Sequence, residues 1–273
     1  MDNRPIGVFD SGLGGLSALA ELERLLPRES LLYFGDSARM PYGGRSAAEI
    51  TAMTEQVIDY LFARDVKLLL VACGTISAIA MPHLAPRCPV PFVDVLCPAA
   101  VAAAAATRSG RVGILATEGT VQSGAYERAL HEINPALRLT SVAAPKLAPL
   151  VEAGRIAPDD PALRAAAAEY ARPFLAADID TLLLGCTHYP LVADSIGAEM
   201  GPRVRLVSNG AEAARALART IAARGLAAGE DAVGGSRFYT TGDSAHFADI
   251  ASRMLARDLG DTVEAVVLPG SRE

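Results

Sequence analysis

Residues 67–75 read KLLLVACGT, a nearly continuous apolar run that ends in a cysteine, a glycine and a threonine. Such runs are typical of parallel strands that helices cover on both faces. A second run, TLLLGCT at 181–187, has the same form and also ends in a cysteine. The two stretches predict a parallel α/β fold in which two similar strands each carry a thiol just beyond the carboxyl end.

The alternation of short apolar runs and helix-length segments continues along the chain. The predicted strands are IGVFD, LLYFG, KLLLVA, PFVDV, RVGILA, LTSVAA, TLLLG, RLVS, RFYTT and VEAVVL. We expect helices at 16–25, 47–64, 98–107, 123–133, 161–176, 210–224 and 245–258. Asp160 before Pro161 predicts one helix start, and Asp243-Ser244 predicts another.

The length of 273 residues exceeds the commonest size of one domain, so we expect two domains around one cleft. No long linker separates them, and short crossings are expected near 97–98 and 208–210. The predicted division is an N-terminal α/β domain of residues 1–97 plus 210–273 and a second α/β domain of residues 98–209. Each is expected to hold a mainly parallel sheet flanked by helices, and the two to be pseudosymmetric, with the active site between them.

The composition of the chain argues against nucleic acids and membranes as partners. The chain has 5% aromatic residues, no Trp and a formal charge of −6, which argue against nucleic acid as a primary partner. It has no apolar run of about eighteen residues and no signal-like N-terminus, so we expect a cytoplasmic protein that does not contact membranes. Four cysteines in such a chain do not indicate a disulfide framework.

Ligands of open α/β sheets bind at the carboxyl ends of strands, and polar or thiol groups follow five predicted strands. The segments are Asp10-Ser11-Gly12, Asp36 to Gly43, Cys73-Gly74-Thr75, Thr117 to Thr120 and Cys186-Thr187-His188. The glycines of DSGLGG at 10–15 lack the spacing of a dinucleotide motif and a Walker lysine. We interpret them as a tight turn that needs glycine backbone geometry and carries one functional carboxylate, Asp10.

The two cysteines admit several readings. Inert burial is common for a lone cysteine, but Cys73 and Cys186 share one context, each ahead of an expected helix start that favours a thiolate. Neither CxxC nor HExxH occurs, which argues against zinc, and a thiol hydrolase would leave one cysteine idle. Two thiols on opposite faces of a carbon could remove a proton and deliver one, inverting a stereocentre. From the residues alone, this reaction and plain packing both stay open.

Five stretches resemble, in order and along nearly the whole chain, the bacterial glutamate racemase family. They are FDSGLGGLS at 9–17, YFGDSARMPYG at 33–43, TEGTVQSGAY at 117–126, GCTHYP at 185–190 and FYTTGD at 238–243. The resemblance implies glutamate as the small-molecule substrate and no pyridoxal phosphate or metal cofactor. It also implies supply of D-glutamate for peptidoglycan synthesis and cell shape, and we expect a homodimer.

The resemblance assigns roles to residues. Cys73 would take the α-proton of D-glutamate with help from Asp10, and Cys186 would act on L-glutamate with help from His188 and Glu152. Because a free thiol titrates near 8.5, such partners are needed to hold the reactive protonation states. Substrate contacts are implied for Asp10, Ser11, Pro41, Tyr42, Gly43, Gly74, Thr75, Thr120, Cys186, Thr187 and His188.

One residue departs from the family pattern Cys-Asn-Thr, because this chain has Cys73-Gly74-Thr75. A buried hydrogen bond to a charged group contributes roughly 1.5–3 kcal/mol, so we expect racemase activity with altered affinity unless the backbone or water replaces the amide. Two alternatives stay open: a racemase of the same superfamily that acts on aspartate or another amino acid, and a non-catalytic amino-acid-binding relative.

Overall fold

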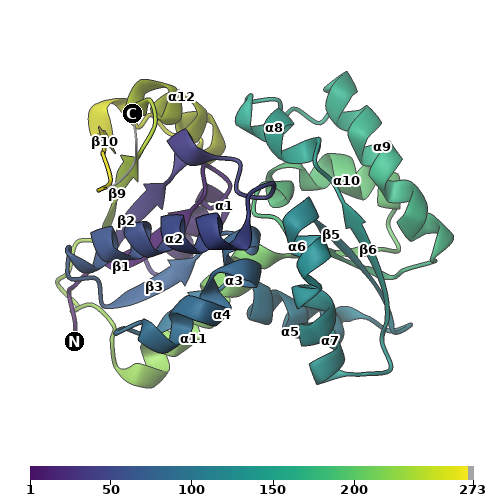
Figure 1. Cartoon of the computed structure of the whole chain (residues 1–273), viewed down its shortest axis with the longest axis horizontal. Helices are drawn as coiled ribbons and strands as arrows, with labels where there is room; N and C mark the ends of the chain where they lie inside the picture. Colours follow the sequence, from purple (N-terminus) through teal and green to yellow (C-terminus); the bar gives the residue numbers. More distant parts are fainter. Residues whose placement is uncertain (270–273) are drawn as a thin grey trace.

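The computed structural model describes residues 1–269 and consists of two parallel sheets flanked by helices. One sheet has six strands in the order β10-β9-β2-β1-β3-β4, and the other has four in the order β6-β5-β7-β8. Every strand pair in both sheets is parallel. Figure 1 shows the two sheets side by side. The predicted α/β class with two parallel sheets is confirmed.

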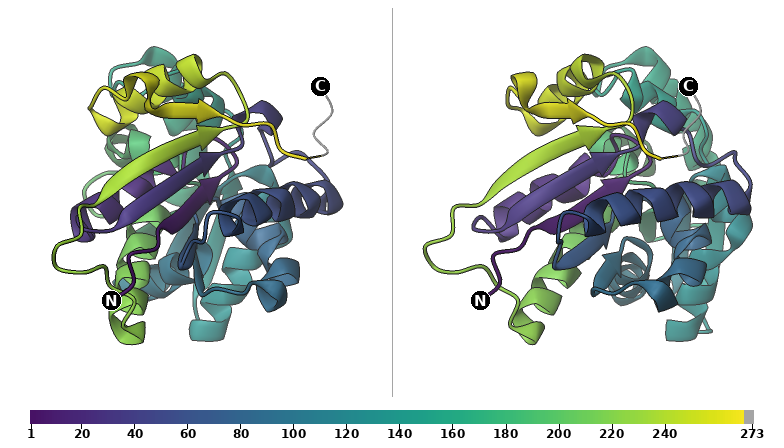
Figure 2. Two further views of the ribbon diagram at one scale, coloured as in Figure 1. Left: turned by 90° about the vertical axis from the view of Figure 1, so that its left-hand side faces the viewer. Right: turned by 60° about the vertical axis from the view of Figure 1, so that its left-hand side comes forward.

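The strands lie close to their predicted positions. The six-stranded sheet contains β1 (Ile6–Asp10), β2 (Ser30–Gly35), β3 (Leu68–Val71), β4 (Phe92–Asp94), β9 (Gly235–Thr240) and β10 (Val263–Ala265). The four-stranded sheet contains β5 (Arg111–Ala116), β6 (Arg138–Ala143), β7 (Thr181–Leu184) and β8 (Arg205–Ser208). Figure 2 shows β9 and β10 (green to yellow) completing the first sheet beside β2, so the last strands join the first ones.

The long helices match prediction more closely than the short ones. The α-helices are α1 (Leu16–Leu25), α2 (Ala47–Phe62), α3 (Gly74–Ile79), α4 (Met81–Leu84), α5 (Leu96–Ala106), α6 (Glu118–Ser123), α7 (Ala125–Ile133), α8 (Leu147–Glu152), α9 (Pro161–Ala176), α10 (Ala193–Met200), α11 (Asn209–Arg224) and α12 (Ser244–Leu255). Short 3-10 helices are η1 (Ser37–Arg39), η2 (Ala85–Arg87), η3 (Tyr189–Val192) and η4 (Gly260–Thr262). The sequence predicted only the start of α3, after Cys73, and did not predict α4, α6, α8 and α10, because a segment of one or two turns is too short to show a helical period.

Side-chain caps start the helices where expected. The Asp160 carboxylate accepts from the backbone N–H groups of Ala162 and Leu163, both at 2.9 Å, and so caps α9. Asp243 caps α12 by accepting from the N–H of His246 at 3.0 Å. Both predicted capping sites are therefore confirmed, and each satisfies donors that the first helical turn leaves free.

Each sheet buries both faces under helices. In the first sheet, α1, α11 and α12 pack on the face that includes Ile6 and Val8, while α2 and α4 cover the face of Phe9 and Leu69. In the second sheet, α8, α9 and α10 cover the side of Leu182, and α5 and α7 cover the other. Burial of each large apolar side chain stabilises the fold by roughly 1.5–3 kcal/mol. These two-sided layers fix the strand ends from which the site is built.

A buried ion pair closes the amino end of the first sheet. Lys67 Nζ lies 2.6 Å from Glu29 Oε2 and donates to the carbonyl oxygens of Asp2 at 2.5 Å and Leu226 at 2.7 Å. Lys67 and Glu29 are both buried, and this network ties the N-terminal segment to the chain that follows α11.

Among residues 1–269, no helix is long and apolar enough to span a membrane.

Candidate active site

A cavity of about 250 Å³ lies where the carboxyl ends of β1 and β3 face that of β7. It therefore takes its walls from both sheets. The lining residues are Asp10, Ser11, Met40, Pro41, Tyr42, Gly43, Cys73, Gly74, Thr75, Thr117, Ala148, Pro149, Glu152, Cys186, Thr187 and His188. Both thiols and almost every predicted site residue thus share one enclosure.

Thr120 is the one predicted residue outside the lining. It lies behind Thr117, whose Oγ1 is 2.8 Å from Thr120 Oγ1 and which also contacts Thr75 Oγ1 at 3.0 Å. The sequence had marked the segment that contains Thr117 but had not assigned Thr117 to the site. Ala148 and Pro149 were missed altogether, because they lie on α8, a short helix without a sequence signal.

The first thiol, Cys73, follows β3 and immediately precedes α3. It is buried, and its Sγ lies 3.5 Å from Ser11 Oγ, which in turn donates to Asp10 Oδ1 at 3.4 Å. Burial raises the pKa of Cys73 to about 12, and the negative charge of Asp10 adds to this effect. At neutral pH Cys73 is a thiol, and Asp10 reaches it through the Ser11 hydroxyl.

Asp10 is fully buried and links the two halves of the cavity. Its Oδ1 accepts from the backbone N–H of Gly12 at 2.7 Å, and its Oδ2 accepts from Thr187 Oγ1 at 3.0 Å. Burial raises the pKa of Asp10, while the nearby His188 and these two hydrogen bonds act in the opposite direction. A carboxyl with a raised pKa in this position can hold or release a proton beside Ser11.

The second thiol has a different partner. Cys186 Sγ lies 3.4 Å from His188 Nδ1, and His188 Nε2 lies 2.8 Å from Glu152 Oε1. Burial disfavours the charged imidazole, but Cys186 and Glu152 outweigh it and raise the pKa of His188 well above 6.5. In the imidazolium form both ring nitrogens donate, Nδ1 toward Cys186 Sγ and Nε2 to Glu152 Oε1.

The local backbone at the two thiols also differs. Cys73 leads directly into the α-helix α3, as expected. Cys186 is followed by a turn and then by the 3-10 helix η3, so the expected helix start at this thiol is only a short 3-10 segment. Cys186 therefore has the His188 ring beside it, whereas Cys73 has the start of α3.

The glycines of residues 10–15 permit close approach of the opposite half. A Cβ at Gly14 would lie 2.5 Å from His188 Nδ1, and one at Gly12 would lie 3.3 Å from Glu152 Oε1. Gly12, Gly14 and Gly15 do not adopt positive φ. The interpretation as a turn that needs glycine backbone geometry was therefore wrong, since the requirement is space for neighbouring side chains. These are Met40 and Glu152 at Gly12, His188 and Thr187 at Gly14, and Asp10 and Ala72 at Gly15.

Gly74 leaves no room for a side chain. A Cβ built at this position would stand 2.3 Å from the carbonyl oxygen of Gly185. The asparagine of the family pattern therefore cannot be added here without moving one half of the cavity relative to the other. The backbone of residue 74, together with the neighbouring Thr75 hydroxyl, forms this part of the wall.

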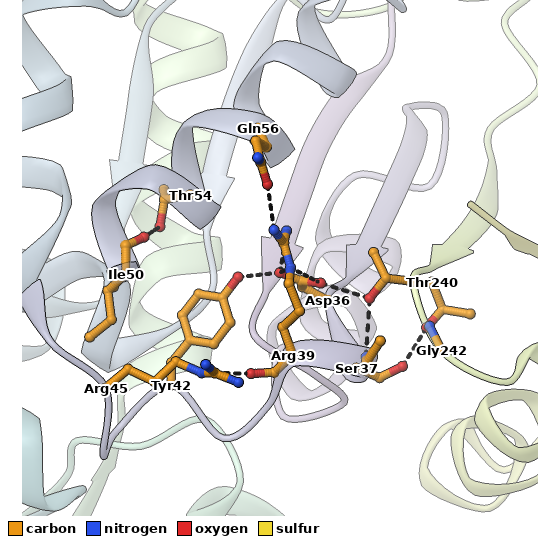
Figure 3. A network of polar contacts seen from close by, with 12 residues as sticks. Asp36, Ser37, Arg39, Tyr42, Arg45, Ile50, Thr54, Gln56, Thr240 and Gly242 are labelled. Carbon is orange, nitrogen blue, oxygen red and sulfur yellow. Dashed lines mark hydrogen bonds and ion pairs between the residues drawn. The ribbon is translucent and has the colours of Figure 1, made fainter. Parts of the chain in front are cut away.

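A polar network fixes the loop that carries Pro41, Tyr42 and Gly43 (Figure 3). Fully buried Asp36 accepts hydrogen bonds from the Tyr42 hydroxyl, from Arg39 Nε at 2.7 Å and from Thr241 Oγ1 at 2.7 Å. The Tyr42 hydroxyl therefore donates to Asp36, and Tyr42 is a lining residue whose hydroxyl is already engaged. The network also joins this loop to the end of β9.

No group of three or more His, Cys, Asp or Glu side chains among residues 1–269 is arranged to hold a metal ion. The groups that converge on the cavity are instead two thiols, two carboxyls, one imidazole and several hydroxyls. Such an arrangement can move protons on two opposite walls of one enclosure.

Known proteins share this sequence and architecture. Residues 6–218 match the family described as Asp/Glu/Hydantoin racemase. A glutamate racemase of Streptococcus pneumoniae serotype 19F (strain G54) is 40% identical over 260 residues, which cover 95% of this chain and 97% of that protein.

Solved structures agree with this match. The crystal structure of glutamate racemase isoform RacE1 from Bacillus anthracis has a TM-score of 0.93 at 38% identity and covers 98% of this chain and 99% of its own. The glutamate racemase of Francisella tularensis subsp. tularensis SCHU S4, crystallised with D-glutamate, has a TM-score of 0.90 at 32% identity with the same coverage. The likeness spans both sheets.

Proposed function

The chain belongs to the Asp/Glu/Hydantoin racemase family, and from this premise we propose that it interconverts L-glutamate and D-glutamate without a cofactor, using Cys73 and Cys186. One observation carries the proposal. Two buried thiols, each after a strand of a different sheet, line one cavity, and each has its own acid/base partner. A reaction that takes a proton from one face of a carbon and adds one to the other needs this pairing.

The protonation pattern suits L-glutamate in the resting enzyme. Cys186, paired with the imidazolium of His188, acts as the base: the α-carbon loses its proton as the Cys186 S–H bond forms. The Cys73 thiol then gives its proton to the opposite face of the carbanion, which yields D-glutamate. In the reverse direction Cys73 is the base and Cys186 the acid.

One turnover leaves Cys73 as a thiolate and Cys186 as a thiol, so the starting state must be restored. Asp10 can return a proton to Cys73 through the Ser11 hydroxyl, since burial raises the Asp10 pKa. Cys186 can lose its proton to solvent once the product leaves, and the His188 imidazolium, paired with Glu152, then faces the thiolate again. We propose that Asp10 relays protons to Cys73, regaining its own from solvent, and that His188 and Glu152 hold the charge beside Cys186.

Hydroxyl and backbone groups around the thiols bind the amino acid. The hydroxyls of Thr75 and Thr117 line the cavity and can donate to the carboxylates of the amino acid. The hydroxyls of Ser11 and Thr187 already donate to Asp10, so they can accept from the amine of the amino acid. The tight backbone at Gly43 and Gly74 adds N–H groups without side-chain bulk. The predicted contact with Thr120 acts through Thr117.

The experiment measures racemisation and exchange of the α-proton with D₂O for both glutamate enantiomers. The wild type should do both, while C73S and C186S should lose racemisation. C97S serves as the control, because Cys97 is exposed and outside this cavity. A wild-type protein that exchanges the α-proton of neither enantiomer would contradict the proposal. A higher rate with aspartate than with glutamate in the same assay would identify aspartate as the substrate instead.

The cellular role follows from the product. D-glutamate is consumed in peptidoglycan synthesis, so we propose a cytoplasmic protein that serves cell-wall formation and cell shape. The division into domains 1–97 plus 210–273 and 98–209, and assembly as a homodimer, remain predictions. Limited proteolysis tests the first, and sedimentation velocity tests the second.

A further inference from the structure

Two glycines touch the opposite half of the molecule through main-chain oxygens. A Cβ at Gly74, which follows β3, would lie 2.3 Å from the carbonyl oxygen of Gly185 at the end of β7. A Cβ at Gly119, which follows β5, would lie 2.9 Å from the carbonyl oxygen of Gly43. Each contact therefore joins a residue after a strand of one sheet to the backbone of the other half.

The contact at Gly74 is the tighter of the two, and each of its two glycines is the sequence neighbour of a thiol. Gly74 directly follows Cys73, and Gly185 directly precedes Cys186. Any change in the distance between these two glycines is therefore passed to the two thiols through a single peptide unit on each side.

The Gly185 main chain is held by hydrogen bonds within its own half. Its N–H donates to the carbonyl oxygen of Leu115 at 2.8 Å, and its carbonyl oxygen accepts from the Tyr126 hydroxyl at 3.4 Å. Tyr126 is fully buried. A methyl group at residue 74 would be relieved chiefly by moving the two halves apart.

Hydrogen bonds pull the halves together around this contact. Ser17 Oγ donates to the carbonyl of Thr187 at 2.9 Å, and Thr187 Oγ1 donates to Asp10 at 3.0 Å. These bonds draw the Cys186 turn toward the first sheet. The contact between Gly74 and Gly185 limits how closely the two halves can approach, because main-chain atoms lie next to one another there.

We propose that Gly74 is a positioning residue that sets the separation of Cys73 and Cys186 by its contact with Gly185. A carbon in contact with a carbonyl oxygen normally lies about 3.3–3.6 Å away, so a methyl group at residue 74 would open the cleft by roughly 1 Å. The inference rests on the proposed function, since the two thiols must both reach one α-carbon.

The test is G74A in the full-length protein, with racemisation of glutamate measured in both directions. Because a misplacement of about 1 Å can cost roughly 10²-fold in rate, kcat should fall by about that factor in both directions. The rate with 2-aminoadipate, which is one methylene longer, should rise relative to that with glutamate, since the cleft is wider. A merely destabilised fold would not change this ratio.

G235A is the matched control, since a Cβ there meets no described atom within 4 Å, and it should keep wild-type kinetics. G119A, with its looser contact, should lose less activity than G74A and shift the substrate ratio in the same direction. If G74A fails to fold, G119A decides by itself. The inference would be overturned if G74A kept the wild-type kcat and substrate ratio, or if G119A did so when G74A does not fold. An inactive wild type would instead overturn the proposed function.

Discussion

The Thr187 hydroxyl donates to the Asp10 carboxylate over 3.0 Å, so the residue after one thiol holds the acid that serves the other. The two residues come from different sheets, and both are buried. The acid on the Cys73 wall is therefore held by a hydroxyl from the wall that carries Cys186.

Replacing Thr187 with valine should uncouple the two walls. A hydrogen bond to a charged group contributes about 1.5–3 kcal/mol, so kcat/KM should fall roughly 10- to 100-fold in both directions. T187S keeps the hydroxyl and should stay close to wild type. Steady-state kinetics with both enantiomers measure the effect, and equal losses in T187V and T187S would argue that the methyl group matters more than the hydrogen bond.

Glu152→Gln should change the pH dependence of the reaction with L-glutamate. Although burial opposes the charge of His188, Cys186 and Glu152 raise its pKa well above 6.5, so His188 stays cationic at neutral pH. Loss of the Glu152 charge lowers the His188 pKa and should move the alkaline limb of the kcat/KM profile to lower pH. E169Q, which removes the exposed ion pair with Lys146, should leave the profile unchanged. An unshifted limb in E152Q would contradict the proposed chain.

The His188–Glu152 pair also predicts how the stability of the fold depends on pH. Because the folded-state pKa of His188 is raised, its contribution to the free energy of unfolding is complete below the unfolded value near 6.5 and is lost as pH rises through the folded value. The difference in unfolding free energy between wild type and E152Q should therefore shrink in alkaline buffer. Urea titrations across that range test the sign, and a difference that grows with pH would refute it.

The two thiols should differ in reactivity toward iodoacetamide. Burial and the charge of Asp10 raise the pKa of Cys73 to about 12, so its reactive thiolate is scarce at mildly alkaline pH. In a C88S/C97S background, peptide mass spectrometry should find Cys186 modified first, and D10N should accelerate modification of Cys73. Faster labelling of Cys73 in the background protein would contradict the asymmetry.

Lys67→Met should destabilise the fold without changing the chemistry. It leaves the buried Glu29 charge and two carbonyl oxygens without their partner, and breaking a buried pair costs about 3–5 kcal/mol. Lys67 lies at the amino end of β3, away from the cavity, so kcat per folded molecule should stay at the wild-type value. K146M removes an exposed pair and should cost at most about 1 kcal/mol. Urea unfolding compares the two variants.

Much of the fold was readable from local pattern. β1, β5 and β8 have their predicted bounds, as do α1 and α9, because buried parallel strands and long capped helices carry strong periodic signals. Since ligands gather at the carboxyl ends of such strands, the same pattern located both thiols, Asp10 and Thr75 in one cavity.

The remaining features depend on contacts between distant segments. The link from Cys73 to Asp10 through Ser11 arises when β1 pairs with β3, and the contact of Gly74 with Gly185 arises only when the two sheets meet. Ala148 and Pro149 belong to a helix too short to show periodicity. A short stretch of sequence does not show which distant segments will meet, nor where a helix of one or two turns will form.

The position of β9 in the six-stranded sheet has a consequence for synthesis of the chain. The strands of the second sheet come from the continuous stretch 111–208 and can assemble while the ribosome is still adding residues, whereas the outer edge of β2 has no partner until β9 emerges. Thr241, just after β9, is also a partner of Asp36 beneath the Pro41–Gly43 loop. The wall that carries Cys73 is therefore the later one to mature, and the Pro41–Gly43 loop gains this support only after residues 235–241 have been made.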